Sequence, residues 1–191
     1  MPRHHRLAAA AAALVLAAWA PHADAADRWA VDAEASTLGF VGLQGGEAFE
    51  GHFSAWTAEI AFDPDDLAAS SVAVVIDMAS AATGAPQRDD LLPGGDWFAV
   101  DEHPQARFAT TGFTHLGGSD YEATAELTIR GLTREVTLPF TLAIDGDRAH
   151  VTGALEVLRT DFDVGTGQWA SGDMVALEVT ITVDLTATRA P

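Results

Sequence analysis

Cysteine and lysine are both absent from this chain of 191 residues. Without cysteine the protein has no disulfide, no thiolate nucleophile, no sulfur ligand for a metal and no cysteine to carry a lipid anchor. The fold therefore depends on its hydrophobic core alone. All ten side chains in the Lys+Arg class are arginines, which we interpret as a compositional bias rather than a functional signal.

Positive charge is also scarce. Ten arginines stand against 28 acidic residues, and the formal net charge is −18 at pH 7. A surface of this sign repels nucleic acid and anionic lipid headgroups. The composition therefore argues against both as partners, and we predict no nucleic-acid binding.

Long hydrophobic runs are lacking except near the N-terminus. There an apolar run over residues 7–18 follows a short basic start and precedes the small-residue pattern Ala23-Asp24-Ala25. These features are typical of a cleavable signal peptide, whereas a membrane-spanning helix needs about 20 apolar residues. We predict a signal peptide over residues 1–25, a mature domain over residues 26–191 that is periplasmic or secreted, and no membrane-spanning segment.

The mature part is rich in alternating apolar and polar residues, the pattern of β-strands with one buried face. The last such segment, residues 175–188, would be roughly 40 Å long at about 3.3 Å per residue. A strand of that length favours a barrel over a small flat sheet. The predicted strands cover residues 29–32, 37–43, 49–62, 72–77, 108–113, 121–129, 135–144, 148–157 and 175–188.

Two of these strands meet at a single glycine. Leu127 and Ile129 are apolar at odd positions before Gly131. Val136 and Leu138 are apolar at even positions after it. This change of phase across a short glycine-containing turn predicts a β-hairpin with one apolar face.

Alternation alone does not say whether the apolar side faces the barrel interior or a lipid bilayer. An outer-membrane barrel needs aromatic girdles at both rims, whereas this chain has one tyrosine and places its phenylalanines within strands. We therefore predict an inward apolar face, which either packs solid or encloses one small ligand. Strand glycines such as Gly42 and Gly51 either leave space for a ligand or mark bulges, and the sequence leaves both open.

Few residues suggest catalysis or metal binding. The mature histidines show no metal-site spacing, and neither a nucleophile elbow nor a phosphate-binding loop is present. We therefore predict no catalytic residue, no metal site and no cofactor. Four arginines are interpreted as salt-bridge partners at loops or at the rim, rather than as headgroup clamps: Arg88, Arg130, Arg134 and Arg159.

A series of short motifs follows the chain in a fixed order: Trp29-Ala-Val-Asp32, Ser36-Thr-Leu-Gly-Phe40, Phe49-Glu-Gly-His-Phe53, Phe62-Asp-Pro64, Arg88-Asp-Asp-Leu91, Asp96-Trp-Phe-Ala-Val-Asp101, Leu127-Thr-Ile-Arg-Gly-Leu-Thr133 and Arg159-Thr-Asp-Phe162. In order and spacing these motifs resemble the YceI-like family of secreted, lipocalin-like proteins. The resemblance implies an all-β fold, an extended antiparallel eight-stranded lipocalin-like barrel with a short helical segment around residues 86–100. It also implies a hydrophobic tunnel and no catalytic residues.

The leading hypothesis is an exported barrel that holds a polyisoprenoid, quinone-like or other long-chain amphiphile for carriage or sequestration. The predicted ligand contacts are Phe40, Phe53, Phe98, Phe108, Leu127, Phe140, Trp169 and Val179, of which Phe98 and Trp169 would lie near the mouth. A neutral headgroup suits the acidic chain better than a phosphate. Two alternatives stay open, an enzyme acting on a lipid-like substrate inside the barrel and a structural or stress-response module without a ligand. A homodimer is also left open.

Overall fold

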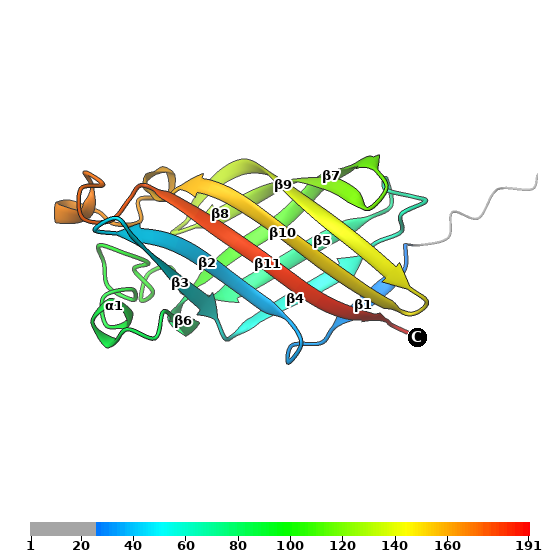
Figure 1. Cartoon of the computed structure of the whole chain (residues 1–191), viewed down its shortest axis with the longest axis horizontal. Coiled ribbons are helices and arrows are strands. Elements are labelled where there is room, and N and C mark those ends of the chain that lie inside the picture. The colour runs from blue at the N-terminus through cyan, green and yellow to red at the C-terminus, as the bar shows by residue number, and fades with distance from the viewer. Residues whose placement is uncertain (1–25) are drawn as a thin grey trace, which may run out of the picture.

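The computed structural model describes residues 26–191, so the predicted signal peptide lies outside the described residues. The described chain forms one antiparallel sheet that closes on itself where β1 (Arg28–Val31) pairs with β11 (Glu178–Arg189). Figure 1 shows the resulting barrel from the side, with its strands running obliquely along the long axis. The helix α1 (Pro86–Asp89) lies at one end and the C-terminus at the other.

Three of the eight strand positions around the barrel are each filled by two short strands, which follow one another along the same line. β1 and β2 (Thr37–Gln44) both pair with β11, and β3 (Glu47–Phe53) and β4 (Trp56–Ala61) lie beside them. β5 (Ser71–Asp77) and β6 (Ala81–Ala82) form the third position. The other positions hold single long strands: β7 (Gln105–Gly117), β8 (Asp120–Ile129), β9 (Leu132–Asp145), β10 (Arg148–Leu158) and β11. The closed eight-stranded antiparallel barrel confirms the predicted fold class.

The predicted strands are present with shifted ends. The expected strand over residues 49–62 is interrupted after β3, and β4 continues it along the next part of the barrel. The last strand starts at Glu178, because Val175 belongs to an end loop and forms only an isolated bridge to Gln44. The helical segment is a single turn, α1. The remaining helical pieces are 3₁₀ turns: η1 (Met78–Ser80), η2 (Arg159–Phe162) and η3 (Gly167–Trp169).

The β8–β9 hairpin agrees with the change of phase in the sequence. Ile129 pairs with Leu132, which leaves Arg130 and Gly131 as a two-residue turn. Both turn residues have positive φ, 50° and 74°, as in the type I′ turns that match the twist of hairpin strands. Glycine adopts this conformation freely, whereas an arginine there is strained and has to be held by other contacts.

Two glycines of the β2–β3 hairpin make room for aromatic rings. Phe40 lies opposite Gly51, and Phe49 lies opposite Gly42. A Cβ atom at Gly51 would stand 2.2 Å from Cζ of Phe40, and one at Gly42 would stand 2.7 Å from Cζ of Phe49. The rings therefore lie against the opposite glycines. This packing role differs from both interpretations that the sequence had left open.

The substitution Gly51→Ala tests this packing. The added methyl group has to displace the Phe40 ring from the core, so we expect a loss of about 1–3 kcal/mol in the free energy of unfolding, measured by urea denaturation. Gly112→Ala is the matched control, because a Cβ atom there meets nothing within 4 Å. Equal stability of the two variants would contradict the proposed ring packing.

Candidate ligand cavity

A cavity of about 240 Å³ lies inside the barrel, and residues from every position around the barrel line it. The lining is almost wholly aliphatic and aromatic. On β11, for example, the inward side chains are Val179, Ile181, Val183, Leu185 and Ala187. The apolar side of the alternating strands thus faces inward. For scale, an engineered apolar cavity of roughly 150 Å³ binds benzene.

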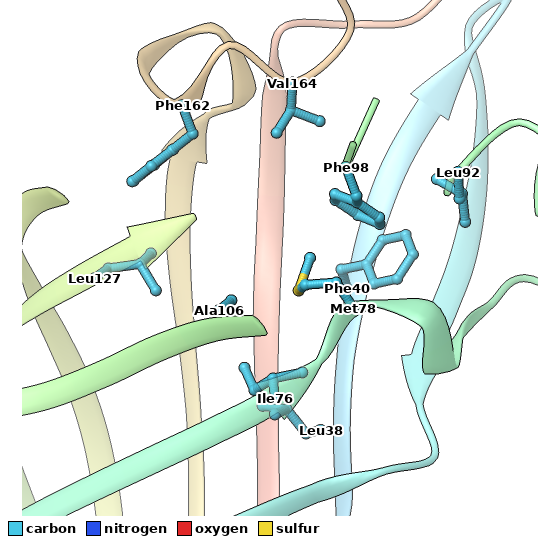
Figure 2. Packing of buried hydrophobic residues seen from close by; sticks show 10 residues of the cluster. All are labelled: Leu38, Phe40, Ile76, Met78, Leu92, Phe98, Ala106, Leu127, Phe162 and Val164. Atoms are coloured by element: carbon cyan, nitrogen blue, oxygen red, sulfur yellow. The ribbon is translucent and has the colours of Figure 1, made fainter. Parts of the chain in front are cut away.

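One end of the cavity is closed by loops and by a cluster of buried side chains. Figure 2 shows Phe40, Met78 and Phe98 gathered there, together with Leu92, which precedes Phe98 in the same loop. Residues 83–104 and 159–177 form the cover, and the two segments are joined because the N–H groups of Gly165 and Thr166 both donate to the Asp96 carbonyl. This α1 end is therefore a lid built from two loops.

Aromatic rings fill the opposite end. Phe62 lies edge-on to Phe113 at 5.2 Å and to Tyr121 at 5.8 Å between ring centroids. Trp29 is 5% exposed, and its indole Nε1 donates to the Phe62 carbonyl at 3.0 Å. These edge-to-face contacts add to the burial energy of the rings. The cavity therefore lies between two packed ends.

Seven of the eight predicted contact residues line the cavity: Phe40, Phe53, Phe98, Phe108, Leu127, Phe140 and Val179. Trp169 does not line it. Its ring packs on that of Trp97, with 5.6 Å between centroids, and it is Trp97 that lines the cavity. Whether these residues contact a ligand stays a prediction. Both tryptophans lie in loop segments at the same end of the barrel, so no pattern in the sequence separates the one that lines the cavity from the one that packs on it.

Arg159 is the one charged residue in the lining. It is 3% exposed and has no carboxylate partner within residues 26–191. All five of its N–H bonds donate to backbone carbonyls. Nε bonds Ala176 at 2.9 Å, Nη1 bonds Val164 at 2.8 Å and Gly165 at 2.9 Å, and Nη2 bonds Val175 at 2.9 Å as well as Trp169. Burial lowers the pKa of Arg159. With every donor used, the guanidinium fastens the lid and has none left for a ligand.

Thr110 carries the one hydroxyl group of the lining, and its single O–H donor is already used. It accepts from the Val72 N–H at 2.8 Å and donates to the Val72 carbonyl at 3.3 Å. These two hydrogen bonds take the place of backbone pairing between β5 and β7 near the start of β5. The hydroxyl therefore offers a ligand no free donor.

The predicted arginine salt bridges are not formed. In the part of the chain that the structure describes, the ion pairs join Arg189 to Asp27 and Asp147, and His150 to Asp184. The four arginines singled out earlier donate instead to neutral oxygens, since backbone carbonyls and amide or hydroxyl groups are the acceptors that lie within reach. That expectation was wrong, because the loops bring carbonyls rather than carboxylates to these side chains.

A polar cluster holds α1 against the barrel. The Asp89 carboxylate accepts from the Thr83 hydroxyl at 2.6 Å and from the Thr83 N–H at 2.7 Å. These hydrogen bonds lower the pKa of Asp89. Arg88 donates to the Thr83 hydroxyl and to Gln44, and its guanidinium lies 4.4 Å from the Phe49 ring centroid. The cluster therefore positions the first lid loop.

Within residues 26–191 no helix is long and apolar enough to cross a membrane. Across the same residues, no group of three or more histidine, aspartate or glutamate side chains is placed to hold a metal ion.

A closed antiparallel barrel around an apolar cavity is the architecture of small β-barrels that enclose a single ligand. Residues 29–187 match the model of the YceI-like domain, so the chain belongs to the YceI-like family.

Related proteins share the fold to different extents. The crystal structure of BcnA from Burkholderia cenocepacia is 37% identical and has a TM-score of 0.81, covering 83% of this chain and 100% of BcnA. A polyisoprenoid binding domain from Saccharophagus degradans, implicated in plant cell wall breakdown, is 17% identical with a TM-score of 0.67, covering 86% of this chain and 99% of that domain. A UPF0312 protein of Vibrio parahaemolyticus is 26% identical over 121 residues, 60% of this chain, and the match spans 64% of that protein's length.

Arg159→Met tests the role of the guanidinium in fastening the lid. The substitution leaves several buried carbonyls without a donor, each at a cost of about 1–3 kcal/mol, so we expect the free energy of unfolding to fall by roughly 3 kcal/mol or more. Arg134→Met is the control, because Arg134 is exposed and donates only to the neighbouring Thr133 carbonyl. Urea denaturation of both variants measures the difference. A loss no larger than in the control would argue against this role.

Asp89 gives a prediction about pH. Because folding lowers its pKa, its contribution to stability is complete above the unfolded pKa, about 3.9, and is lost as the pH falls through the lower folded value. Asp89→Asn should therefore lower the Tm at neutral pH, and its difference from the unmodified protein should shrink in acid. Asp90→Asn is the control, since the described residues show no side-chain hydrogen bond for Asp90. A difference that stays constant with pH would contradict the proposed role.

Proposed function

We propose that this protein binds a polyisoprenoid or a similar long-chain amphiphile inside its barrel, and carries or sequesters it without making or breaking bonds. The observation that carries the proposal is the cavity wall, which presents hydrocarbon from every position around the barrel. Its hydroxyl and its guanidinium, on Thr110 and Arg159, already donate to backbone carbonyls. Apolar surface removed from water contributes about 25 cal/mol per Å². Ordering the flexible tail reduces that gain.

The family supports this proposal. The polyisoprenoid binding domain of Saccharophagus degradans uses the same barrel, which suits the burial of a long apolar tail. The acidic composition also suits a ligand without negative charge. If the N-terminal segment acts as the predicted signal peptide, the protein works in the periplasm or outside the cell.

The size of the cavity indicates how a long tail would fit. Its volume of about 240 Å³ is below the roughly 300–1,000 Å³ of pockets for drug-sized ligands. Phe53 and Phe108 line the cavity yet are only partly buried, so their inner surfaces are free to contact a ligand. A long tail therefore fills the barrel by turning such rings aside.

An enzymatic role would need a reactive polar group inside the barrel. The only candidates in the lining are Thr110 and Arg159, and both side chains are held by backbone groups. The cavity chemistry therefore favours binding over catalysis. A filled structural module would need a packed interior, and the open volume favours a ligand instead.

Val74→Trp tests the proposal by filling the cavity. Val74 lines the cavity, whereas its neighbour Ala73 is exposed on the outer face of β5, so Ala73→Trp adds the same side chain outside. We expect native mass spectrometry of protein purified from its own periplasm to show a bound lipid in the unmodified protein and in Ala73→Trp. Val74→Trp should lose most of it. Organic extraction then identifies the lipid.

Thermal unfolding of the three proteins is the control for folding, because a buried tryptophan costs about 1–3 kcal/mol when it overpacks a core. The proposed function is wrong if the unmodified protein carries no lipid and binds none of the amphiphiles offered to it. It is also wrong if a folded Val74→Trp retains the lipid in full.

A further inference from the structure

The hairpin of β9 and β10 is paired along only part of its length. From the connecting turn, which can be followed in Figure 1, the pairing continues as far as Phe140 opposite Gly153. In this register residues 135–139 would continue opposite residues 154–158. Over that stretch of the described chain, however, β9 pairs only with β8, and β10 pairs only with β11. We call this unpaired stretch the seam.

Two features of the chain account for the seam. Pro139 stands where the pairing stops, and proline has no N–H with which to continue a ladder. At the far end of β9, Arg130 donates to the carbonyls of Trp97, at 2.8 Å, and Asp163. These bonds tie the β8–β9 turn to the two lid loops. They also hold Arg130 in its positive-φ conformation, so the separation of β9 from β10 is built into the structure.

The seam borders the cavity on both sides. Leu138 from β9 and Leu155 and Val157 from β10 all line the cavity. The facing edges of the two strands carry neutral N–H and C=O groups that do not pair across the seam. The wall is therefore apolar inside and offers peptide donors and acceptors along this line.

Trp97 supplies a second, independent observation. Its indole Nε1 is the one buried side-chain polar atom without a hydrogen-bond partner within residues 26–191. Trp97 lies at the lid end of the seam, because Arg130 binds its carbonyl and the guanidinium of Arg159, which follows β10, lies 5.6 Å from its ring centroid. A buried donor left unpaired on a residue that lines the cavity requires an explanation. An acceptor supplied by a ligand is one that fits the cavity.

We propose that the seam and Trp97 Nε1 form the site for the polar end of the ligand, while its tail lies in the cavity. This inference rests on the proposed function. The recognised group is a neutral oxygen, an alcohol or a quinone carbonyl, which accepts from Nε1 and completes its hydrogen bonds on the strand edges. Phosphate is disfavoured, because the exposed Glu135 and Glu156 stand on the outer faces of the two strands and the Arg159 donors are all used.

Trp97→Phe removes the indole donor and keeps an aromatic ring. The probes are a polyprenol, the matching headgroup-free isoprenoid hydrocarbon and the matching polyprenyl phosphate, each in binding titrations. We expect Trp97→Phe to weaken polyprenol binding by about fivefold to tenfold and to leave the hydrocarbon unchanged. The phosphate should bind the unmodified protein more weakly than the alcohol does. Trp169→Phe is the control, because Trp169 does not line the cavity.

The outcomes separate the two proposals. Failure of the unmodified protein to bind any of the probes would overturn the proposed function, and this inference with it. Equal weakening of the alcohol and the hydrocarbon by Trp97→Phe would overturn the headgroup site alone. Preferential binding of the phosphate would do the same.

A second experiment does not depend on Trp97. Thr137→Cys with Glu156→Cys places one thiol on each side of the seam, and because the chain has no cysteine these are its only thiols. Thr141→Cys with Thr152→Cys is the matched control in the paired part of the same strands, where the two hydroxyl oxygens are 2.7 Å apart. Each pair is joined by a short linker that a reductant cleaves.

Joining the seam removes the place for the polar end, so it should weaken polyprenol binding by about tenfold, with recovery after reduction, while the joined control pair binds normally. Unchanged polyprenol affinity with a verified seam cross-link would overturn the site. So would cross-linking between two molecules, or to an added extended peptide, in place of cross-linking within one chain, because either result would make the strand edges a protein-binding surface.

Discussion

The guanidinium of Arg159 is the interaction on which the closed end of the barrel depends. One side chain gathers five carbonyls from the segment that follows β10, and this segment in turn bonds the Asp96 carbonyl of the other lid loop. A Cβ atom at Gly165 would stand 2.1 Å from Nη1, so the loop backbone approaches the cation as closely as glycine alone permits. The enclosed apolar volume exists because these loops stay in place.

The same interaction keeps the cavity apolar. A buried cation without a carboxylate is costly unless its donors are satisfied, and here backbone dipoles satisfy all five. The donors of Arg159 are therefore all used within the protein, and none is available to a ligand. What remains for a ligand is hydrocarbon along the barrel, the edges of β9 and β10 at the seam, and the Nε1 donor of Trp97. Polarity is thus confined to one line of the wall.

Alternation allowed the strands, the hairpin at Gly131 and the inward apolar face to be predicted, because side-chain direction in a strand depends only on position along the chain. The role of Arg159 could not be predicted, since its partners are backbone carbonyls that every residue carries. The packing of Phe40 on Gly51 needs the register between strands. Pro139 did carry a usable signal, because a proline inside an alternating strand indicates an unpaired edge.

An amphiphile poses two demands that a uniform barrel cannot meet together. Its tail requires a wall without free polar groups, and its headgroup requires hydrogen bonds. A ladder paired around the whole circumference would meet only the first, because every peptide group would be consumed between strands. The absence of pairing before Phe140 on β9 releases peptide groups at one place, and Arg130 ties that place to Trp97. Pro139 and the hydrogen bonds of Arg130 together therefore account for the break in the ladder that gives the cavity a polar side.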